Sequence, residues 1–276
     1  MGDRLAAVRY LADESVAITV YLADRLGKPI LCEGPAGVGK TELGKAIAAA
    51  TGRRLIRLQC YEGLDESKAL YEWNYKKQLL RIQADAAAVD WHTVEQDIFA
   101  EEFLLARPLL SAIRAVEPVV LLIDEIDRLE VETEALLLEV LSDWQVSIPE
   151  LGTMTAIRTP LVVLTSNNTR ELSEALKRRC LFLHMDYPDV EREEAILRAR
   201  IPDIDVAFAR RISRVVHTIR GFDLKKSPSI SETLDWARTL LLLGIETVDT
   251  AAIQRTLPLL LKYQQDIERV AADLPK

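Results

Sequence analysis

The sequence predicts an α/β core with a parallel sheet between helices, followed by a small all-helical segment. Up to residue 188, short apolar runs alternate with apolar residues at three- and four-residue steps. Such alternation is typical of a parallel sheet covered by helices on both faces. After Pro188 only helical patterns remain, and the low count of 11 Gly and 11 Pro in 276 residues favours long elements. We therefore divide the chain into domains of residues 1–188 and 189–276.

The individual elements follow from these patterns. Continuous apolar runs predict buried strands, and the turn at Pro149–Gly152 joins two of them in a hairpin. Residues 59–97 show no clear period but hold much of the aromatic content, at Tyr61, Tyr71, Trp73, Tyr75 and Trp91. Strands are expected at 29–33, 54–58, 118–123, 146–148, 154–157, 161–164 and 181–185, core helices at 3–26, 41–51, 98–116 and 132–144, and later helices at 191–200, 206–219, 229–243 and 250–270.

The charge is unevenly distributed. The chain has 35 basic and 43 acidic residues, a net charge of −8. Residues 189–276 contain 14 of each sign, so the whole acidic surplus lies in residues 1–188. An acidic core argues against a protein that wraps bulk nucleic acid, although it leaves room for a local basic groove.

The three cysteines are an odd number without metal-ligand spacing, at Cys32, Cys60 and Cys180. This usage fits apolar packing in a reducing compartment. No apolar run approaches the roughly 20 residues that span a bilayer. The first ten residues also lack the apolar centre of a signal peptide. We expect a cytoplasmic protein without a membrane span.

A phosphate-binding loop is the strongest local signal. Residues 34–41 read GPAGVGKT and match G-x-x-x-x-G-K-[ST], between a predicted strand and a predicted helix. Backbone N–H groups of such a loop cradle phosphates, the lysine reaches the β- and γ-phosphates, and the hydroxyl binds Mg²⁺. The alternative is a glycine-rich turn that arose by chance. ATP is assigned to Gly34, Pro35, Ala36, Gly37, Val38, Gly39, Lys40, Thr41 and Glu42, and Mg²⁺ to Thr41.

A second signal is the apolar run 119–123, which ends in Asp124 and Glu125. Ligands of parallel sheets bind at the carboxyl ends of the strands. We therefore predict that Asp124 holds Mg²⁺ and that Glu125 orients and deprotonates the attacking water. The alternative is that Asp124 caps the helix that follows.

Two further motifs complete the candidate site. The strand 161–164 continues into Thr165, Ser166 and Asn167, where Asn167 is placed to contact the γ-phosphate or the water, or is an ordinary loop residue. Arg178 and Arg179 follow eleven residues later. An arginine supplied to a neighbouring subunit accelerates phosphoryl transfer by about 10³–10⁵. The alternative is a solvated helix end.

The motifs GPAGVGKT, LLIDE, TSN and ALKRRC, in this order before a helical segment, resemble an AAA+ ATPase. The resemblance implies a P-loop NTPase core with a helical lid, with Asn167 as sensor 1, Arg179 as arginine finger and Arg178 as a second contact. YEGLDES, YEWNYKKQLL and the hairpin before the Asn167 strand further resemble MoxR-type ATPases. The nearest branch is CoxD-like and is associated with maturation of carbon monoxide dehydrogenase.

The resemblance also implies a task and partners. MoxR-type ATPases form rings, here expected to be a homo-hexamer, and act as chaperones together with a von Willebrand A domain protein. The expected client is a metalloenzyme, a molybdenum hydroxylase. Residues 61–75 and Pro149–Gly152 are candidate client loops, with core or interface packing as the alternative. Many AAA+ lids carry a sensor 2 arginine where this chain has Ser231, with Lys226 as a substitute.

Two other functions remain open on these grounds. AAA+ proteins also serve as nucleic-acid motors or clamp loaders, which the acidic core and the lack of a helix-turn-helix or zinc-finger signature disfavour. A nucleotide-binding scaffold without hydrolysis is disfavoured by the intact Asp124–Glu125 pair. Stimulation of ATPase turnover by DNA or RNA distinguishes a motor from a chaperone.

Overall fold

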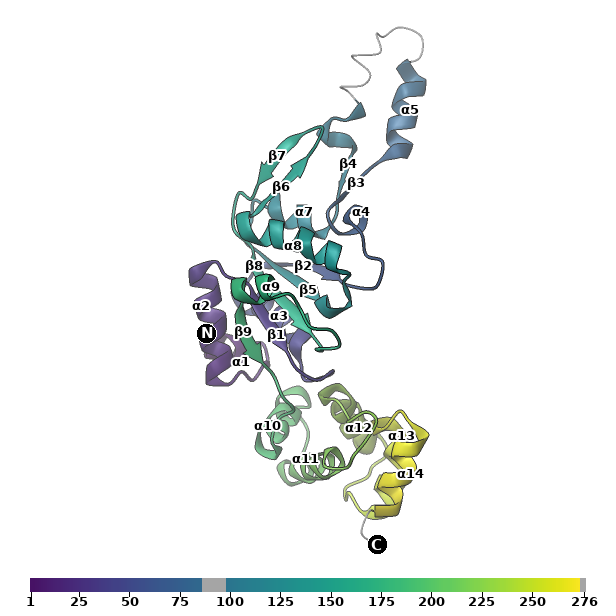
Figure 1. Ribbon diagram of the computed structural model, residues 1–276. Coiled ribbons are helices and arrows are strands. Elements are labelled where there is room, and N and C mark those ends of the chain that lie inside the picture. Colours follow the sequence, from purple (N-terminus) through teal and green to yellow (C-terminus); the bar gives the residue numbers. More distant parts are fainter. Residues whose placement is uncertain (86–97, 274–276) are drawn as a thin grey trace. The chain divides into compact units, whose positions relative to one another are not determined.

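The computed structural model describes residues 1–85 and 98–273 (Figure 1). The chain forms two compact units. The sheet unit comprises residues 1, 14–33 and 41–183, and the helical unit comprises residues 2–13, 34–40 and 184–276. The phosphate loop is thus grouped with the helical unit, although it connects a strand and a helix of the sheet unit in sequence.

The sheet unit is built on five strands in the order β2-β5-β8-β1-β9. Strand β1 (Ile30–Glu33) pairs in parallel with β8 (Leu161–Ser166), β8 with β5 (Val119–Asp124), and β5 with β2 (Arg54–Gln59). Strand β9 (Leu181–His184) lies beside β1. The strand ends that carry the predicted site residues therefore belong to adjacent strands of one sheet.

Helices cover both faces of this sheet. Leu121 and Ile123 of β5 join the apolar cluster formed with α7 (Pro108–Ile113), α8 (Val131–Asp143) and α9 (Glu174–Arg179). Leu122 points to the opposite face, toward α3 (Lys40–Thr51), because successive strand residues alternate. A Cβ on Gly44 of α3 would lie 2.9 Å from Leu122, so a glycine is what lets the helix approach the strand. The expected layers of helix, sheet and helix are confirmed.

Two small antiparallel sheets accompany the main sheet. The predicted hairpin is present as β6 (Gln145–Ile148) and β7 (Gly152–Thr155). Strand β3 (Tyr71–Trp73) pairs with β4 (Leu104–Ala106), a pair that the sequence patterns did not predict. The helices α2 (Glu14–Leu26), α4 (Glu66–Ala69) and α5 (Tyr75–Asp85) complete this unit, with 3-10 turns η1 (Glu101–Phe103) and η2 (Ile126–Arg128).

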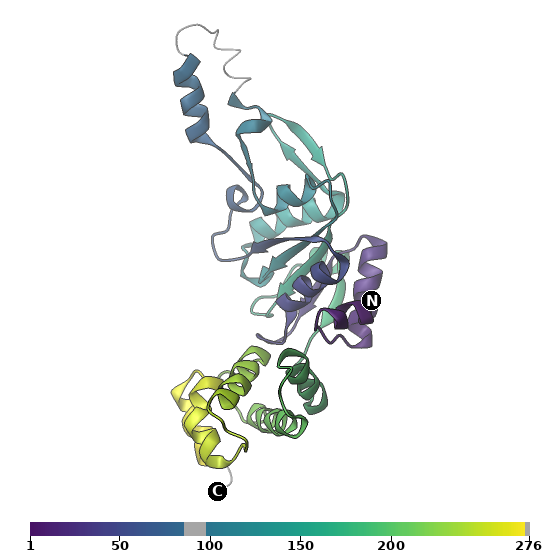
Figure 2. The same cartoon turned by 180° about the vertical axis from the view of Figure 1, so that it is seen from behind.

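The helical unit contains α1 (Gly2–Ala7) and five helices near the C-terminus, seen from behind in Figure 2. Its core gathers around Trp236, Phe208 and Ile212. Four of the five C-terminal helices begin with an Asp or Ser whose side chain accepts a backbone N–H, which is the usual start of a helix. The five helices are α10 (Val190–Arg200), α11 (Val206–Arg220), α12 (Ile230–Leu242), α13 (Thr250–Leu260) and α14 (Gln264–Asp273).

Three helix predictions were wrong. The expected helix 3–26 is two helices, because Arg9 adopts a left-handed φ of 61° after α1. The expected helix 98–116 contains η1, β4 and α7, since Arg107 is extended before Pro108, as residues before proline prefer. The expected helix 250–270 breaks at Leu261, which is extended. The tryptophan at 91 lies outside the described residues.

Candidate ATPase site

The phosphate loop has the curvature that its glycines predict. Gly34 and Gly37 have φ values of 152° and 81°, and a Cβ on Gly37 would lie 2.1 Å from Cβ of Ser229 in the same unit. The ammonium of Lys40 is buried and donates to the carbonyl oxygens of Gly34 and Pro35, at 2.6 Å each. The loop thus closes around the ammonium of Lys40, which gives it the concave backbone of a phosphate-binding loop.

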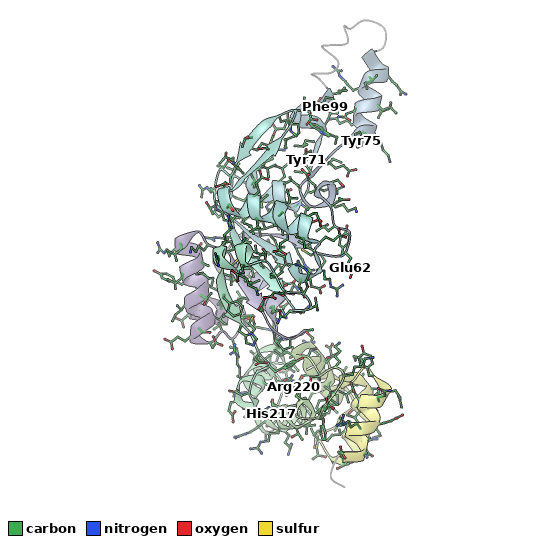
Figure 3. The ribbon with its side chains drawn as sticks, viewed as in Figure 1. Glu62, Tyr71, Tyr75, Phe99, His217 and Arg220 are labelled. Atoms are coloured by element: carbon green, nitrogen blue, oxygen red, sulfur yellow. The ribbon has the colours of Figure 1, made fainter. Side chains whose placement is uncertain are left out.

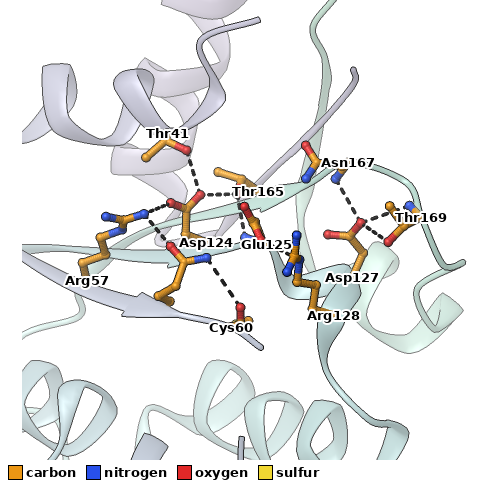
Figure 4. A network of polar contacts seen from close by, with 11 residues as sticks. Thr41, Arg57, Cys60, Asp124, Glu125, Asp127, Arg128, Thr165, Asn167 and Thr169 are labelled. Carbon is orange, nitrogen blue, oxygen red and sulfur yellow. Dashed lines mark hydrogen bonds and ion pairs between the residues drawn. The ribbon is translucent and has the colours of Figure 1, made fainter. Parts of the chain in front are cut away.

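The carboxylate of Asp124 is the centre of the polar network in Figure 4. Asp124 is 2% exposed, and its Oδ1 accepts from the hydroxyls of Thr41 at 2.8 Å and Thr165 at 2.5 Å. Its Oδ2 accepts from Nη2 of Arg57 at 2.5 Å. The structure therefore brings together the two residues predicted to hold Mg²⁺. Hydroxyl and carboxylate oxygens are ligands that Mg²⁺ prefers, so the donor set fits this metal.

The capping alternative for Asp124 does not describe this structure. The residue at the N-cap of η2 is Glu125, and no side chain makes a cap bond there. The carboxylate of Asp124 is directed instead to the hydroxyls on α3 and β8 and to Arg57 on β2.

Glu125 has an unusual backbone conformation. Its φ of 58° and ψ of 49° place it in the left-handed region, which costs a residue with a Cβ roughly 1–2 kcal/mol. Its N–H donates to Oγ1 of Thr165 at 2.9 Å, and its Oε2 pairs with Nε of Arg128 at 2.6 Å. Strain of this kind gathers at functional positions. Here the left-handed conformation changes the direction of the backbone directly after the buried strand β5.

Asp127 links the β5 end to the β8 end. Its Oδ2 accepts from the backbone N–H of Asn167 at 3.2 Å and from the N–H and hydroxyl of Thr169 at 3.0 and 2.6 Å. Burial raises the pKa of Asp127, but the hydrogen bonds from Thr169 and Asn167 outweigh it and lower the pKa below its usual value. The predicted Asn167 thus lies on a loop that Asp127 holds. No pattern singled out Asp127 beforehand, apart from its place after Asp124 and Glu125.

The negative charge of this strand end also acts on a neighbouring thiol. Burial, and then the charges of Asp124, Glu125 and Asp127, raise the pKa of Cys60 to about 12. Its backbone N–H donates to the carbonyl of Asp124 at 2.8 Å. Cys60 packs as a neutral thiol, in line with the expected role of the cysteines. Within the described residues, no group of three or more His, Cys, Asp or Glu is arranged to hold a metal by itself.

The two arginines lie at the surface at the end of α9. Arg178 pairs with Glu174 at 2.7 Å, and its side chain is 80% exposed. Arg179 is also exposed and donates from Nε to Oγ of Ser142 at 2.6 Å and from Nη1 to the carbonyl of Ala175 at 3.1 Å. These contacts run to α8 and α9, so the role of both arginines toward a neighbouring subunit stays a prediction. Glu42, the last residue assigned to ATP, pairs with Lys45 on α3.

The helical unit contacts the phosphate loop through residues that the sequence patterns did not single out. The N–H of Ile230 donates to the carbonyl of Gly37 at 3.1 Å, and the hydroxyl of Tyr187 to that of Ala36 at 3.2 Å. Ser229, which caps α12, packs against Gly37, whereas Ser231 is exposed. Lys226 pairs with Glu232 at 3.5 Å. The serine that touches the loop is thus Ser229 rather than Ser231.

A buried ion pair supports Tyr187. Arg220 donates from both terminal nitrogens to Glu193, at 2.8 Å each, and from Nε to the carbonyl of Pro228 at 2.9 Å. Its guanidinium carbon lies 4.7 Å from the ring centre of Tyr187 (Arg220 is labelled in Figure 3). The side chains of Arg220 and Glu193 are 7% and 1% exposed.

Comparisons with known proteins agree with this architecture. Residues 29–180 match the family described as AAA domain (dynein-related subfamily). A protein of Staphylococcus haemolyticus, "Uncharacterized protein SH1500", is 26% identical over 258 residues, which are 89% of each chain. The gas vesicle ATPase GvpN of Haloferax mediterranei is 26% identical over 204 residues, or 71% of this chain and 57% of that relative.

Among solved structures, the RuvB Holliday junction branch migration motor of Thermotoga maritima superposes with a TM-score of 0.53 at 18% identity, covering 89% of this chain and 67% of that one. At this identity the likeness concerns the fold alone. In the described part of the chain, no helix is both long and apolar enough to cross a membrane.

Proposed function

We propose, for a chain that belongs to the AAA domain family (dynein-related subfamily) and hydrolyses ATP, that hydrolysis in an oligomeric ring remodels a client protein. The observation that carries this proposal is the Asp124 network, which joins the hydroxyl at the start of α3 to the acidic end of β5. It supports a working hydrolysis site and not only a nucleotide-binding scaffold. The acidic core favours a protein client over nucleic acid.

In this proposal each site residue has one task. Lys40 and the N–H groups of residues 34–40 hold the phosphates, and Thr41 with Asp124 holds Mg²⁺, which neutralises charge on the β- and γ-phosphates. Glu125 orients the attacking water and accepts its proton, while Asn167 positions the γ-phosphate. Arg128 pairs with Oε2 of Glu125, and the proton can go to the other carboxylate oxygen.

The arginines act between subunits. We place Arg179, with Arg178 beside it, against the γ-phosphate of the next subunit in a hexamer. Support comes from their exposure at the end of a short helix that follows the β8 end. Arg179→Ala should bind ATP and lose turnover by about 10³-fold or more. Mixing it with Lys40→Ala should restore activity, because each variant supplies what the other lacks; no rescue at any mixing ratio would refute action in trans.

For the client, we place the chain with the MoxR-type ATPases of the carbon monoxide dehydrogenase branch, as the core of residues 1–188 with a lid of residues 189–276. The motif resemblance and the homology to a gas vesicle ATPase support this placement. The client is then a cytoplasmic molybdenum hydroxylase whose metal centre is completed, and the partner is a von Willebrand A domain protein.

The two predicted client loops lie near each other. Burial raises the pKa of Tyr71, and the charges of Glu66 and then of Glu150 at the hairpin tip raise it further. Tyr71 packs edge to face on Trp73, with ring centres 6.4 Å apart, and Trp73 packs edge to face on Phe99, with ring centres 5.3 Å apart. Tyr71 and Phe99 are labelled in Figure 3. Tyr71 and Trp73 are therefore structural. The exposed Tyr75, Leu79 and Leu80 of α5 are better candidates for client contact.

The decisive experiment is to trap the client. Glu125→Gln should bind ATP, stall hydrolysis and retain its client, so that affinity purification with ATP recovers a molybdenum hydroxylase and a von Willebrand A domain protein. Lys40→Ala is the control, since it should bind neither nucleotide nor client. Recovery of nucleic acid instead, together with strong stimulation of wild-type turnover by DNA or RNA, would favour the motor alternative.

A further inference from the structure

Arg57 is a charged residue beside the site that the proposed mechanism does not use. It lies on β2, opposite Leu122 of β5, while Gln59 lies opposite Asp124. Residues two apart on a strand share one face, so Arg57 and Gln59 both project beside Asp124. Nη2 of Arg57 lies 2.5 Å from Oδ2 of Asp124 and also bonds Oε1 of Gln59 (Figure 4).

The two oxygens of Asp124 are used differently. Oδ1 receives the hydroxyls of Thr41 and Thr165, whereas Oδ2 receives the guanidinium of Arg57. A buried carboxylate without a compensating charge is costly, and Arg57 compensates it in the absence of a metal. A metal ion that binds this carboxylate brings its own positive charge. A guanidinium and a divalent cation then compete for the same acid.

The side chain of Arg57 can also move away from Asp124. Its side chain is 45% exposed, whereas that of Asp124 is 3% exposed. The guanidinium bonds Asp124 and Gln59, both beside it at the strand ends, so solvent can replace these contacts when it swings outward. Exposed guanidinium groups lose little free energy on such a move.

We propose that Arg57 is a positioning residue that neutralises Asp124 when Mg²⁺ is absent and yields to Mg²⁺ when the nucleotide binds. The competition raises the Mg²⁺ concentration that nucleotide binding requires, and it keeps the buried acid in place between turnovers. This inference rests on the proposed role of Asp124 as a Mg²⁺ residue.

The test measures Mg²⁺ demand without turnover. Binding of a fluorescent ATP analogue is titrated with Mg²⁺ in the Glu125→Gln background, with and without Arg57→Gln. Loss of one charged hydrogen bond at a half-exposed pair should lower the Mg²⁺ concentration for half-maximal binding roughly three- to tenfold. Arg57→Lys keeps a charge but not the planar fork and should fall between the two.

A matched control lies on the same strand. Arg54 is similarly exposed and pairs with Glu117, away from Asp124, so Arg54→Gln should leave the Mg²⁺ demand unchanged. Thermal unfolding gives a second measurement: Arg57→Gln should melt lower than wild type without Mg²⁺ and gain more from Mg²⁺ with nucleotide.

The outcomes separate this inference from the function on which it rests. A Mg²⁺ demand that is unchanged or higher in Arg57→Gln, while the wild type responds to Mg²⁺, would overturn the role of Arg57 alone. A wild type whose nucleotide binding ignores Mg²⁺, and an Asp124→Asn variant that behaves like it, would refute the metal role of Asp124 and the competition with it.

Discussion

Both compact units bury a carboxylate against an arginine, but they do so in different ways. In the helical unit, Glu193 takes both terminal nitrogens of an arginine that is itself buried and bonded to a carbonyl. In the sheet unit, Asp124 takes one nitrogen of an arginine that is nearly half exposed. The first pair is fixed from both sides, so it serves structure. In the second pair, the exposed arginine can be displaced from Asp124, as is needed if this carboxylate is to bind a metal ion.

The largest expected effect is kinetic and belongs to the sheet unit. Glu125→Gln should lower ATP turnover by about 10²–10⁴-fold, because the amide cannot accept a proton from water. Steady-state phosphate release measures the turnover, and denaturant unfolding measures the stability of the same variant. The denaturation midpoint should stay near that of the wild type, since the side chain is not part of the core. Normal turnover would mean that another group is the base.

The largest expected loss of stability belongs to the helical unit. Arg220→Ala leaves the carboxylate of Glu193 buried and unpaired, which costs about 3–5 kcal/mol. Hydrogen exchange of α11 and α12 amides should rise far more than that of β5 amides. Arg57→Ala is the matched change in the sheet unit and should cost less, because Asp124 keeps its hydrogen bonds from Thr41 and Thr165. Equal losses would remove the distinction drawn above between the two pairs.

A pH-dependent effect should appear at Glu134, which lies on α8 of the sheet unit. Burial raises its pKa, but hydrogen bonds from Ser173 and Arg170 and the charge of Arg170 lower it below the ordinary 4.5. A depressed pKa contributes stability that is present above the unfolded value and is lost as the pH falls through the folded value. The free energy of unfolding, measured from pH 7 to pH 3, should therefore decrease once the pH is below about 4.5.

Glu134→Gln is the control for that titration. It should cost about 1.5–3 kcal/mol at pH 7, the usual size for hydrogen bonds to a charged group. Its stability should also fall less steeply as the pH is lowered. A slope equal to that of the wild type would assign the acid sensitivity to Asp127 or to other carboxylates.

The smallest expected effect concerns helix starts, which carry side-chain caps at four of the five C-terminal helices of the helical unit. The carboxylate of Asp205 accepts the N–H of Phe208 at 2.9 Å at the start of α11. Asp205→Ala should lower stability by about 1 kcal/mol, measured by thermal unfolding. Asp205→Asn should retain most of it. A neutral Asp205→Ala would show that packing around Trp236 alone determines this helix.

Much of the main sheet could be predicted because its strands are continuous apolar runs. A run such as 119–123 must be buried on both faces, which a central strand of a parallel sheet provides. The pair β3–β4 could not, since each strand is three residues long and the partners are separated by more than 30 residues. Two predicted helices were too long because the backbone conformation of a single residue, Arg9 or Leu261, ends the helix there. Apolar periodicity carries no information about a single dihedral angle.

The site shows the same division. Thr41, Asp124 and Glu125 follow from motifs, because phosphate and metal chemistry restrict the residue type at each place. Arg57, Asp127 and Tyr187 depend on strand register and on loop paths, so no local pattern marks them. Of these, Arg57 had a usable signal: it is a basic residue two positions before the end of the strand that pairs with β5.

The left-handed backbone of Glu125 has a consequence for how such a sequence is selected. Glycine adopts this conformation without the steric cost of a Cβ, and asparagine with less of it. Selection for fold stability alone would therefore replace the glutamate. Glycine or asparagine at position 125 should therefore give a more stable but less active protein, so the glutamate here exchanges stability for chemistry.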